Sequence, residues 1–211
     1  MKERQNYNLE KFLSKCKEEI NIFEIFNLVE TNHSSFLAYL FDRNETHGEG
    51  NLFFKIFLEE TNLPVEYADE DYIVEKETPT ESEDNKVKPE TSESDDTQKG
   101  QSKSRIDIMI YCKEKFIIDT EVKVGSPPDE QQINREYKGL EKKAGEYNIN
   151  KEKNMYGILI SPYPLDNSKF NWVGWSTIVK CLERFNENIQ NSRLKGILNK
   201  YIEYAKDNIL K

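Results

Sequence analysis

Hydrophobic residues recur at helical spacing through the first third of the chain. Residues 8–20 form one such stretch, and an apolar run at 22–29 follows it. Residues 30–34 interrupt the pattern, which resumes over 36–41 and 52–57. Side chains three and four positions apart share a helix face, so the pattern predicts amphipathic helices. We expect the aromatic residues of this region to be core: Phe23, Phe26, Phe36, Phe41, Phe53 and Phe57.

A charged hairpin is predicted in the middle of the chain. Two short apolar strands, residues 106–111 and 116–124, flank a polar turn. Asp107 interrupts the first strand, and three charged residues at alternate positions interrupt the second: Asp119, Glu121 and Lys123. Alternate residues of a strand share a face, and such charges are costly to bury unless they pair or hold a metal ion. The hairpin is therefore either a functional site or an ordinary half-exposed hairpin with a solvated charged face.

The C-terminal half alternates between helical and strand patterns. After Pro127, the apolar stripe of a helix is expected to face the core (Ile133, Tyr137, Leu140 and Ala144), beside a polar-to-basic stripe (Gln131, Arg135, Lys138 and Lys142). Residues 155–161 predict a buried strand, and residues 172–175 a strand or turn. Ser176 or Thr177 is expected to cap the next helix, and the last helix covers about 192–209.

The acidity of the chain is local. The net charge is −9, but residues 66–98 contain 13 acidic residues and 3 lysines, which leaves the remainder at about +1. Net charge therefore excludes no class of partner. Residues 71–77 could start the sheet. Residues 78–104 contain no aromatic residue and only Val87 as a large aliphatic one, so we expect a flexible acidic insertion between this first strand and the strand at 106–111. It either shields a site by mimicking nucleic acid or is a solvated insertion without a role.

Cysteine usage and hydropathy indicate the compartment. The three cysteines form no C-x-x-C pair, so neither a disulfide framework nor a cysteine-bound zinc ion is indicated. The first residues contain no apolar leader, and no run of 18 apolar residues exists. We therefore expect a cytoplasmic protein with no membrane partner.

An acid on one strand followed by Glu-x-Lys on the next resembles the PD-(D/E)XK nuclease superfamily. The matching residues are Ile106-Asp107 and Glu121-Val122-Lys123, with Ile106 where the usual proline stands. One bacterial branch of the superfamily is similar in further motifs: its Glu-x-x-His-Ser and His-Gly match Glu30, His33-Ser34 and His47-Gly48. Its Gln-Leu-x-Arg-Tyr motif matches Gln132-Ile133-Asn134-Arg135, but Glu136 occupies the tyrosine position and Tyr137 comes one residue later.

This resemblance implies an α/β fold with a restriction-endonuclease-like, mixed four-stranded sheet in the order α-β-β-β-α-β. The sheet would be flanked by helices and preceded by an N-terminal helical region. We expect one nuclease-like domain over residues 1–211, with N-terminal helices over 1–62. The insertion at 78–104 lies between the first two strands, and residues 105–211 supply the catalytic hairpin, the remaining strands and the C-terminal helices.

The resemblance also implies the chemistry. Asp107, Glu121 and the backbone carbonyl of Val122 would hold Mg²⁺ or Mn²⁺, and Lys123 would position or deprotonate the attacking water. Glu30 would complete the catalytic site, directly or through water. The implied partner is a nucleic-acid substrate, with DNA favoured over RNA, and a homodimer or partner subunit is left open.

Several residues have two interpretations at this stage. Gln132 and Arg135 are expected to bind substrate, whereas Lys138 and Lys142 fit a solvated helix face better. Asp119 either joins the site or is a solvated acid at the start of a strand. Trp172 and Trp175 could stack on bases, although packing under the sheet is favoured.

The histidines also leave alternatives. His33 could orient the Glu30 carboxylate, whereas a zinc site made with His33, His47 and Glu30 is disfavoured. Three hypotheses for the whole chain remain open. They are a metal-dependent nuclease, a catalytically silent nuclease fold that binds nucleic acid or protein, and an unrelated α/β protein whose charged hairpin is a surface feature.

Overall fold

The computed structural model describes residues 21–26, 28–79 and 105–211. The predicted helix at 8–20 and most of the acidic insertion lie outside these residues. The described elements, in chain order, are α2 (Ile22–Phe26), α3 (Glu30–Phe41), α4 (Leu52–Glu60), the 3₁₀ helix η1 (Val65–Asp69), β1 (Ile73–Pro79), β2 (Arg105–Cys112), β3 (Phe116–Val122), α5 (Glu130–Glu146), β4 (Met155–Ile160), β5 (Phe170–Val173), α6 (Trp175–Asn188) and α7 (Ser192–Asn208).

The strands form one mixed sheet of five strands in the order β1-β2-β3-β4-β5. β1, β2 and β3 pair antiparallel, whereas β3, β4 and β5 pair parallel. The expected mixed α/β fold is confirmed, and β5 adds a fifth strand at the position where the sequence left a strand or a turn open. All seven residues of β3 are buried, because this strand lies at the centre of the sheet.

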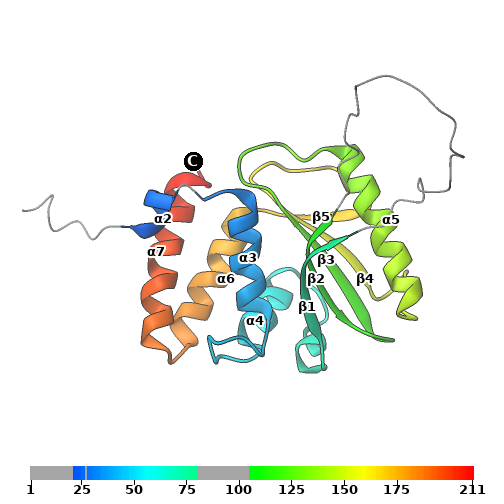
Figure 1. Ribbon diagram of the computed structural model, residues 1–211, viewed down its shortest axis with the longest axis horizontal. Helices are drawn as coiled ribbons and strands as arrows, with labels where there is room; N and C mark the ends of the chain where they lie inside the picture. The colour runs from blue at the N-terminus through cyan, green and yellow to red at the C-terminus, as the bar shows by residue number, and fades with distance from the viewer. Residues whose placement is uncertain (1–20, 27, 80–104) are drawn as a thin grey trace, which may run out of the picture.

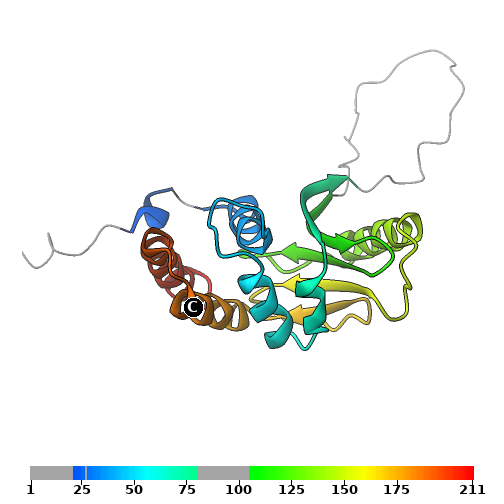
Figure 2. The same cartoon turned by 90° about the horizontal axis from the view of Figure 1, so that it is seen from below.

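Helices cover both faces of the sheet. Figures 1 and 2 show α5 on one side and α3, α4, α6 and α7 on the other. Alternate residues of β4 follow this division: Ile158 and Ile160 join the large core with the N- and C-terminal helices, whereas Leu159 packs with Ile133 of α5. A face covered in this way leaves little solvent for charged residues in the central strand.

Helix α3 begins earlier than its hydrophobic pattern predicts. Residues 30–34, which interrupt that pattern, are the first turn of the helix. The Asn32 side chain accepts a hydrogen bond from Val29 N at 3.0 Å, which satisfies a backbone donor at the helix start. The polar residues therefore serve the helix terminus, and they place Glu30 at its first position.

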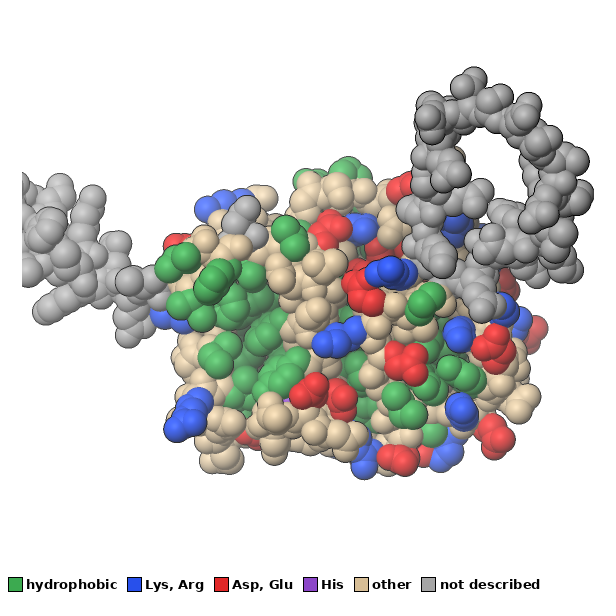
Figure 3. Space-filling view, viewed as in Figure 1, with side chains coloured by type: hydrophobic (Ala, Val, Ile, Leu, Met, Phe, Trp, Pro, Cys, Tyr) green, Lys and Arg blue, Asp and Glu red, His purple; other side chains and the backbone are tan. Residues whose placement is uncertain are grey.

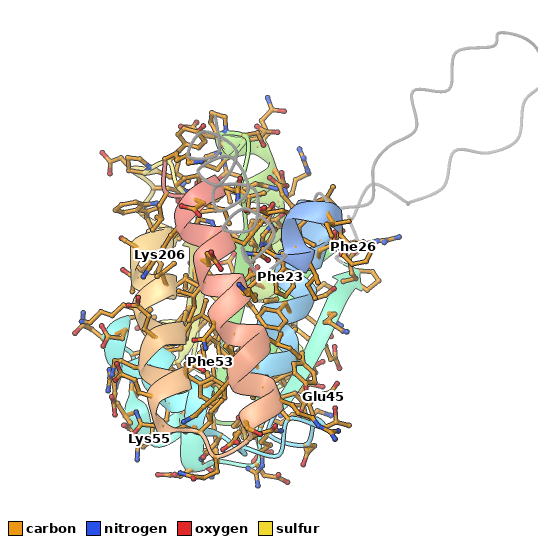
Figure 4. The ribbon with its side chains drawn as sticks, turned by 90° about the vertical axis from the view of Figure 1, so that its left-hand side faces the viewer. Phe23, Phe26, Glu45, Phe53, Lys55 and Lys206 are labelled. Atoms are coloured by element: carbon orange, nitrogen blue, oxygen red, sulfur yellow. The ribbon has the colours of Figure 1, made fainter. Side chains whose placement is uncertain are left out.

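The prediction that Phe26 is core is wrong. The side chain of Phe26 is 72% exposed, whereas Phe23 packs against Tyr201 of α7 with ring centroids 5.3 Å apart. Figure 4 shows Phe23 between α7 and α3, with Phe26 on the outside. Exposed hydrophobic side chains gather where α2 lies beside α7 (Figure 3). Those of the α2 segment are Ile22, Ile25, Phe26 and Val29.

The remaining helix predictions need small corrections. Helix α6 begins at Trp175 with Gly174 as its N-cap, so neither Ser176 nor Thr177 caps it.

Among the described cysteines, Cys112 and Cys181 are free thiols. No helix in the described part of the chain is long and apolar enough to cross a membrane.

Candidate active site

The carboxyl end of β3 brings the charged residues of the hairpin together. Pairing between β2 and β3 runs from Cys112–Phe116 to Ile108–Thr120. Asp107 lies one residue beyond the last of these pairs, and its Oδ2 accepts a hydrogen bond from Val122 N at 3.0 Å. The backbone itself therefore fixes the orientation of this acid. In Figure 1 the loops after β3 and β4 lie at the top, beside the first turns of α3 and α5.

Lys123 lies between two carboxylates. Its Nζ is 2.6 Å from Glu121 Oε1 and 3.4 Å from Glu30 Oε2. Glu30 Oε1 also accepts a hydrogen bond from Val124 N at 3.3 Å, which attaches the start of α3 to the end of β3. The side chain of Glu121 is 1% exposed and that of Lys123 is 12% exposed, so the ammonium group reaches a buried acid from the solvent side.

The first turns of α5 contact the same cluster. Asp129 caps the helix by accepting a hydrogen bond from Gln131 N at 2.9 Å. Gln132 Nε2 then donates to Glu121 Oε1 at 2.7 Å and to Glu136 Oε1 at 2.8 Å. Because an amide nitrogen has two hydrogens, one group holds both acids. Arg135, predicted with Gln132 to bind substrate, is exposed beside them.

Glu136 is the residue that sequence reasoning missed. It stands where the resembling family has tyrosine, yet its side chain is fully buried and its Oε2 has no hydrogen-bond partner among the described residues. Its four-residue spacing from Gln132 was the available signal, since i and i+4 residues share a helix face. Tyr137, by contrast, packs partly buried against Ile133, Leu159 and Phe170 as its core stripe predicted.

Asp119 is not a solvated acid. Its side chain is fully buried, and both carboxylate oxygens lack a hydrogen-bond partner in the described part of the structure. Because all of β3 is buried, the solvated-face interpretation of the hairpin is wrong. A carboxylate buried without partners is strongly destabilised in its charged form.

The electrostatics of the cluster show an excess of negative charge. Burial raises the pKa of Glu121 to about 8 and that of Glu136 to about 7, and neighbouring acids add to both shifts. Burial also raises the pKa of Asp107, and it raises the pKa of Asp119 well above its ordinary range, with help from the Glu136 charge. Burial acts to lower the pKa of Lys123, but the surrounding carboxylates raise it above its usual value.

The donor set fits a divalent cation. Oxygen ligands from carboxylates are those that Mg²⁺ prefers, and both oxygens of Asp119 and the Oε2 atoms of Glu121 and Glu136 are buried without a hydrogen-bond partner among the described residues. Burial is the largest cause of the raised pKa values of these acids, and a bound cation would favour their charged forms. Within the described ranges, no three His, Cys, Asp or Glu side chains are grouped closely enough to hold a metal ion as they stand. Glu121 Oε1 instead forms an ion pair with the Lys123 ammonium group.

The two histidines lie outside the carboxylate cluster. His33 Nδ1 hydrogen-bonds to the Tyr201 hydroxyl at 2.7 Å, and its Nε2 is buried without a partner among the described residues. The prediction that His33 orients Glu30 is therefore wrong. His47 Nε2 donates to Asp42 O at 2.9 Å and its Nδ1 accepts from Glu49 N, so His47 organises a loop.

Comparison with known proteins identifies the family. A sequence profile described as the PD-(D/E)XK nuclease superfamily matches residues 20–206, which is most of the chain. Neither the curated proteins nor the solved structures gave a significant match.

Proposed function

The chain belongs to the PD-(D/E)XK nuclease superfamily, and on this premise we propose that it is a metal-dependent nuclease that hydrolyses phosphodiester bonds in nucleic acid. One observation carries the proposal. The acid of β2 and the Glu-x-Lys at the end of β3 lie at one end of the sheet, with Asp107 fixed on Val122 N and Glu121 Oε1 held by Gln132 Nε2 at 2.7 Å.

Asp107, Glu121 and the carbonyl of Val122 would hold the metal ion. Mg²⁺ or Mn²⁺ held there would supply charge neutralisation at the phosphate and activation of the attacking water. The hydrogen bond from Val122 N to Asp107 supports this assignment, because it fixes one carboxylate before any ligand arrives. Gln132 fixes the other carboxylate through Glu121 Oε1.

Lys123 would position the attacking water and stabilise the developing negative charge. Burial acts to lower the pKa of Lys123 and the neighbouring carboxylates raise it above its usual value, so the ammonium group is charged in the metal-free protein and would stabilise developing negative charge. Glu30 would hold the ammonium group in place from α3, and it remains a candidate for the group that accepts the proton from water. Gln132 and Arg135 lie at the start of α5, where a phosphate backbone would approach.

A cleavage panel tests the proposal. Wild type and Asp107→Asn are incubated with plasmid DNA, single-stranded DNA and RNA, each in Mg²⁺, Mn²⁺ and EDTA. We expect cleavage by wild type that requires metal and is lost in Asp107→Asn, with DNA favoured over RNA. Cleavage that persists in EDTA or in the variant would reject the assigned metal site. Comparing sedimentation with and without DNA tests whether a homodimer forms.

A second candidate function is a catalytically silent fold that binds nucleic acid or protein. The observation that favours it is the contact between Lys123 and Glu121, because the ammonium group holds an oxygen that a metal ion would need. Thermal unfolding with increasing Mg²⁺ separates the two functions, since a ligand that binds only the folded state raises its stability. No stabilisation together with no cleavage would favour the silent fold.

A further inference from the structure

Trp172 is exposed where the sequence favours packing. Its side chain is 44% exposed, whereas Trp175, three residues later, is 1% exposed and donates its Nε1 to Lys123 O at 2.8 Å. The expectation that both tryptophans pack under the sheet is therefore correct for Trp175 and wrong for Trp172. Single exposed hydrophobic residues are common on protein surfaces, so the role of Trp172 depends on what lies around it.

The sheet register connects Trp172 with the candidate active site. Glu121 of β3 pairs with Leu159 of β4, and Leu159 pairs with Trp172 of β5. These three residues form one row across parallel strands and project to the same face, on which α5 packs. Two strand spacings place the backbones of Trp172 and Glu121 about 10 Å apart.

The indole ring is held in place rather than free. Trp172 Nε1 donates to Ser161 O at 3.0 Å, at the carboxyl end of β4. The ring also rests on Gly174, where a Cβ atom would lie 3.2 Å from Trp172 Cζ2. One edge of the ring is therefore bonded and one side is supported by backbone, while the remainder faces solvent. A ring fixed in this way loses little conformational entropy on binding.

Positive charge accompanies the ring on the same side of the sheet. Lys169 precedes β5, and its Nζ bonds Asn134 Oδ1 of α5 at 2.6 Å. Arg135 is the next residue of α5 and is exposed. Lys169 lies three residues before Trp172, about 10 Å along the strand. An aromatic ring and basic side chains on one side of a sheet are the combination that single-stranded nucleic acids bind, because every base has a stacking face.

We propose that Trp172 is a stacking platform for one unpaired base of the substrate, a few nucleotides from the phosphate at the Glu121–Lys123 site. The proposal rests on the proposed function and deepens it by naming the substrate class, which is single-stranded nucleic acid. Fully paired duplex offers no free base face, so Trp172 contributes nothing to its binding.

The first test measures binding without cleavage. Short oligothymidylate and a blunt duplex are titrated in Mg²⁺ into a Lys123→Met background, with and without Trp172→Ala. We expect Trp172→Ala to weaken oligothymidylate binding by roughly 10-fold or more and to leave duplex binding unchanged. Phe26→Ala, which removes a more exposed aromatic residue on α2, is the control and changes neither affinity. Equal effects on both substrates, or none, overturn the proposal.

The second test identifies the contact itself. An abasic position is moved along the oligonucleotide, and affinities are compared with and without Trp172. One abasic position is expected to weaken binding only when Trp172 is present, which is the coupling that a double-mutant cycle detects. Trp172→Phe should restore most of the affinity. If Trp172 had only a structural role, the affinities of the variants would instead change in parallel with their thermal stability. Absence of coupling at every position overturns the platform.

The two proposals fail separately. If the abasic position and Trp172 are coupled in binding but wild type never cleaves, the result would support the platform and reject the hydrolysis. Cleavage of single strands with KM unchanged in Trp172→Ala would reject the platform and support the hydrolysis.

Discussion

Gln132 Nε2 bridges two buried acids, since it donates to Glu121 Oε1 at 2.7 Å and to Glu136 Oε1 at 2.8 Å. With both hydrogens committed to carboxylates, the amide has one orientation, and that orientation holds Glu121 toward the end of β3. Groups that fix a metal ligand typically affect metal affinity by about 10- to 100-fold. Glu136 thus acts on the site through Gln132.

Glu136→Gln is expected to lower the affinity for Mg²⁺ about 10-fold, because the bridging amide loses one charged acceptor. Calorimetric titration of Mg²⁺ measures the change. Glu130→Gln, in the exposed first turn of the same helix, is the matched control and should bind as wild type does. If Glu136 acts through Gln132, the effects of Glu136→Gln and Gln132→Ala will not add. Strict additivity would contradict the bridge.

Asp119→Asn is expected to stabilise the metal-free protein by about 1–3 kcal/mol at pH 8. The substitution removes a fully buried acid that has no hydrogen-bond partner within the described ranges, and it supplies an N–H donor near two further acids with an unpartnered Oε2, Glu121 and Glu136. Chemical denaturation in EDTA measures the change, with the exposed Asp166→Asn as the control. We also expect Mg²⁺ to stabilise the variant less than wild type. A variant less stable than wild type in EDTA would show that Asp119 has a partner at present unaccounted for.

His33 is expected to make stability fall in mild acid. Burial lowers its pKa from 6.5 to about 4, with the Glu30 charge opposing the shift. The unfolded chain therefore takes up the proton first, so this contribution is complete above pH 6.5 and is lost as the pH falls toward 4. At 1.36 kcal/mol per pKa unit the loss is about 3 kcal/mol.

The measurement compares wild type with His33→Gln, which keeps a polar partner for the Tyr201 hydroxyl. Unfolding free energies are determined at intervals between pH 7.5 and pH 4, within the window set by the two pKa values. The difference between the proteins should shift in favour of the variant as the pH falls. A difference that does not depend on pH would mean that His33 is protonated equally in both states.

The sequence predicts the charged hairpin well because strand alternation is a local rule. Asp119, Glu121 and Lys123 fall on one face from spacing alone. Whether that face is buried depends on what packs against it, and the packing element is α5, whose first turns come after the hairpin. The interpretation of Asp119 as a solvated acid was wrong for this reason, because the local sequence pattern of the strand does not predict that α5 covers it.

The same limit explains the two aromatic errors. Phe26 has helical spacing to Phe23, but α2 is a helix of only five residues, and Phe26 lies on its outer side. Trp172 lies in a short strand at the edge of the sheet, where one side of the strand pairs with no other strand in the described part of the chain. Spacing predicts which residues share a face, whereas element length and position in the sheet decide how much of that face is covered.

The motif residues were found by resemblance, and the structure adds how they are held. Asp107, Glu121 and Lys123 meet at the end of β3, and Glu30 joins them from α3. The departure at Glu136 could not be interpreted from the motif, because a tyrosine position filled by an acid has no meaning until its neighbours are known. Its hydrogen bond to Gln132 supplies that meaning.

Single-turnover cleavage by wild type and Lys123→Met tests whether the protein is a metal-dependent nuclease that uses Lys123. The assay uses single-stranded DNA in Mg²⁺, with Lys138→Met on the exposed face of α5 as the matched control. We predict that Lys123→Met slows cleavage by about 100-fold or more, while the control cleaves at the wild-type rate and EDTA stops all three. A wild type that never cleaves, or a Lys123→Met protein that cleaves as fast as wild type, would contradict the account.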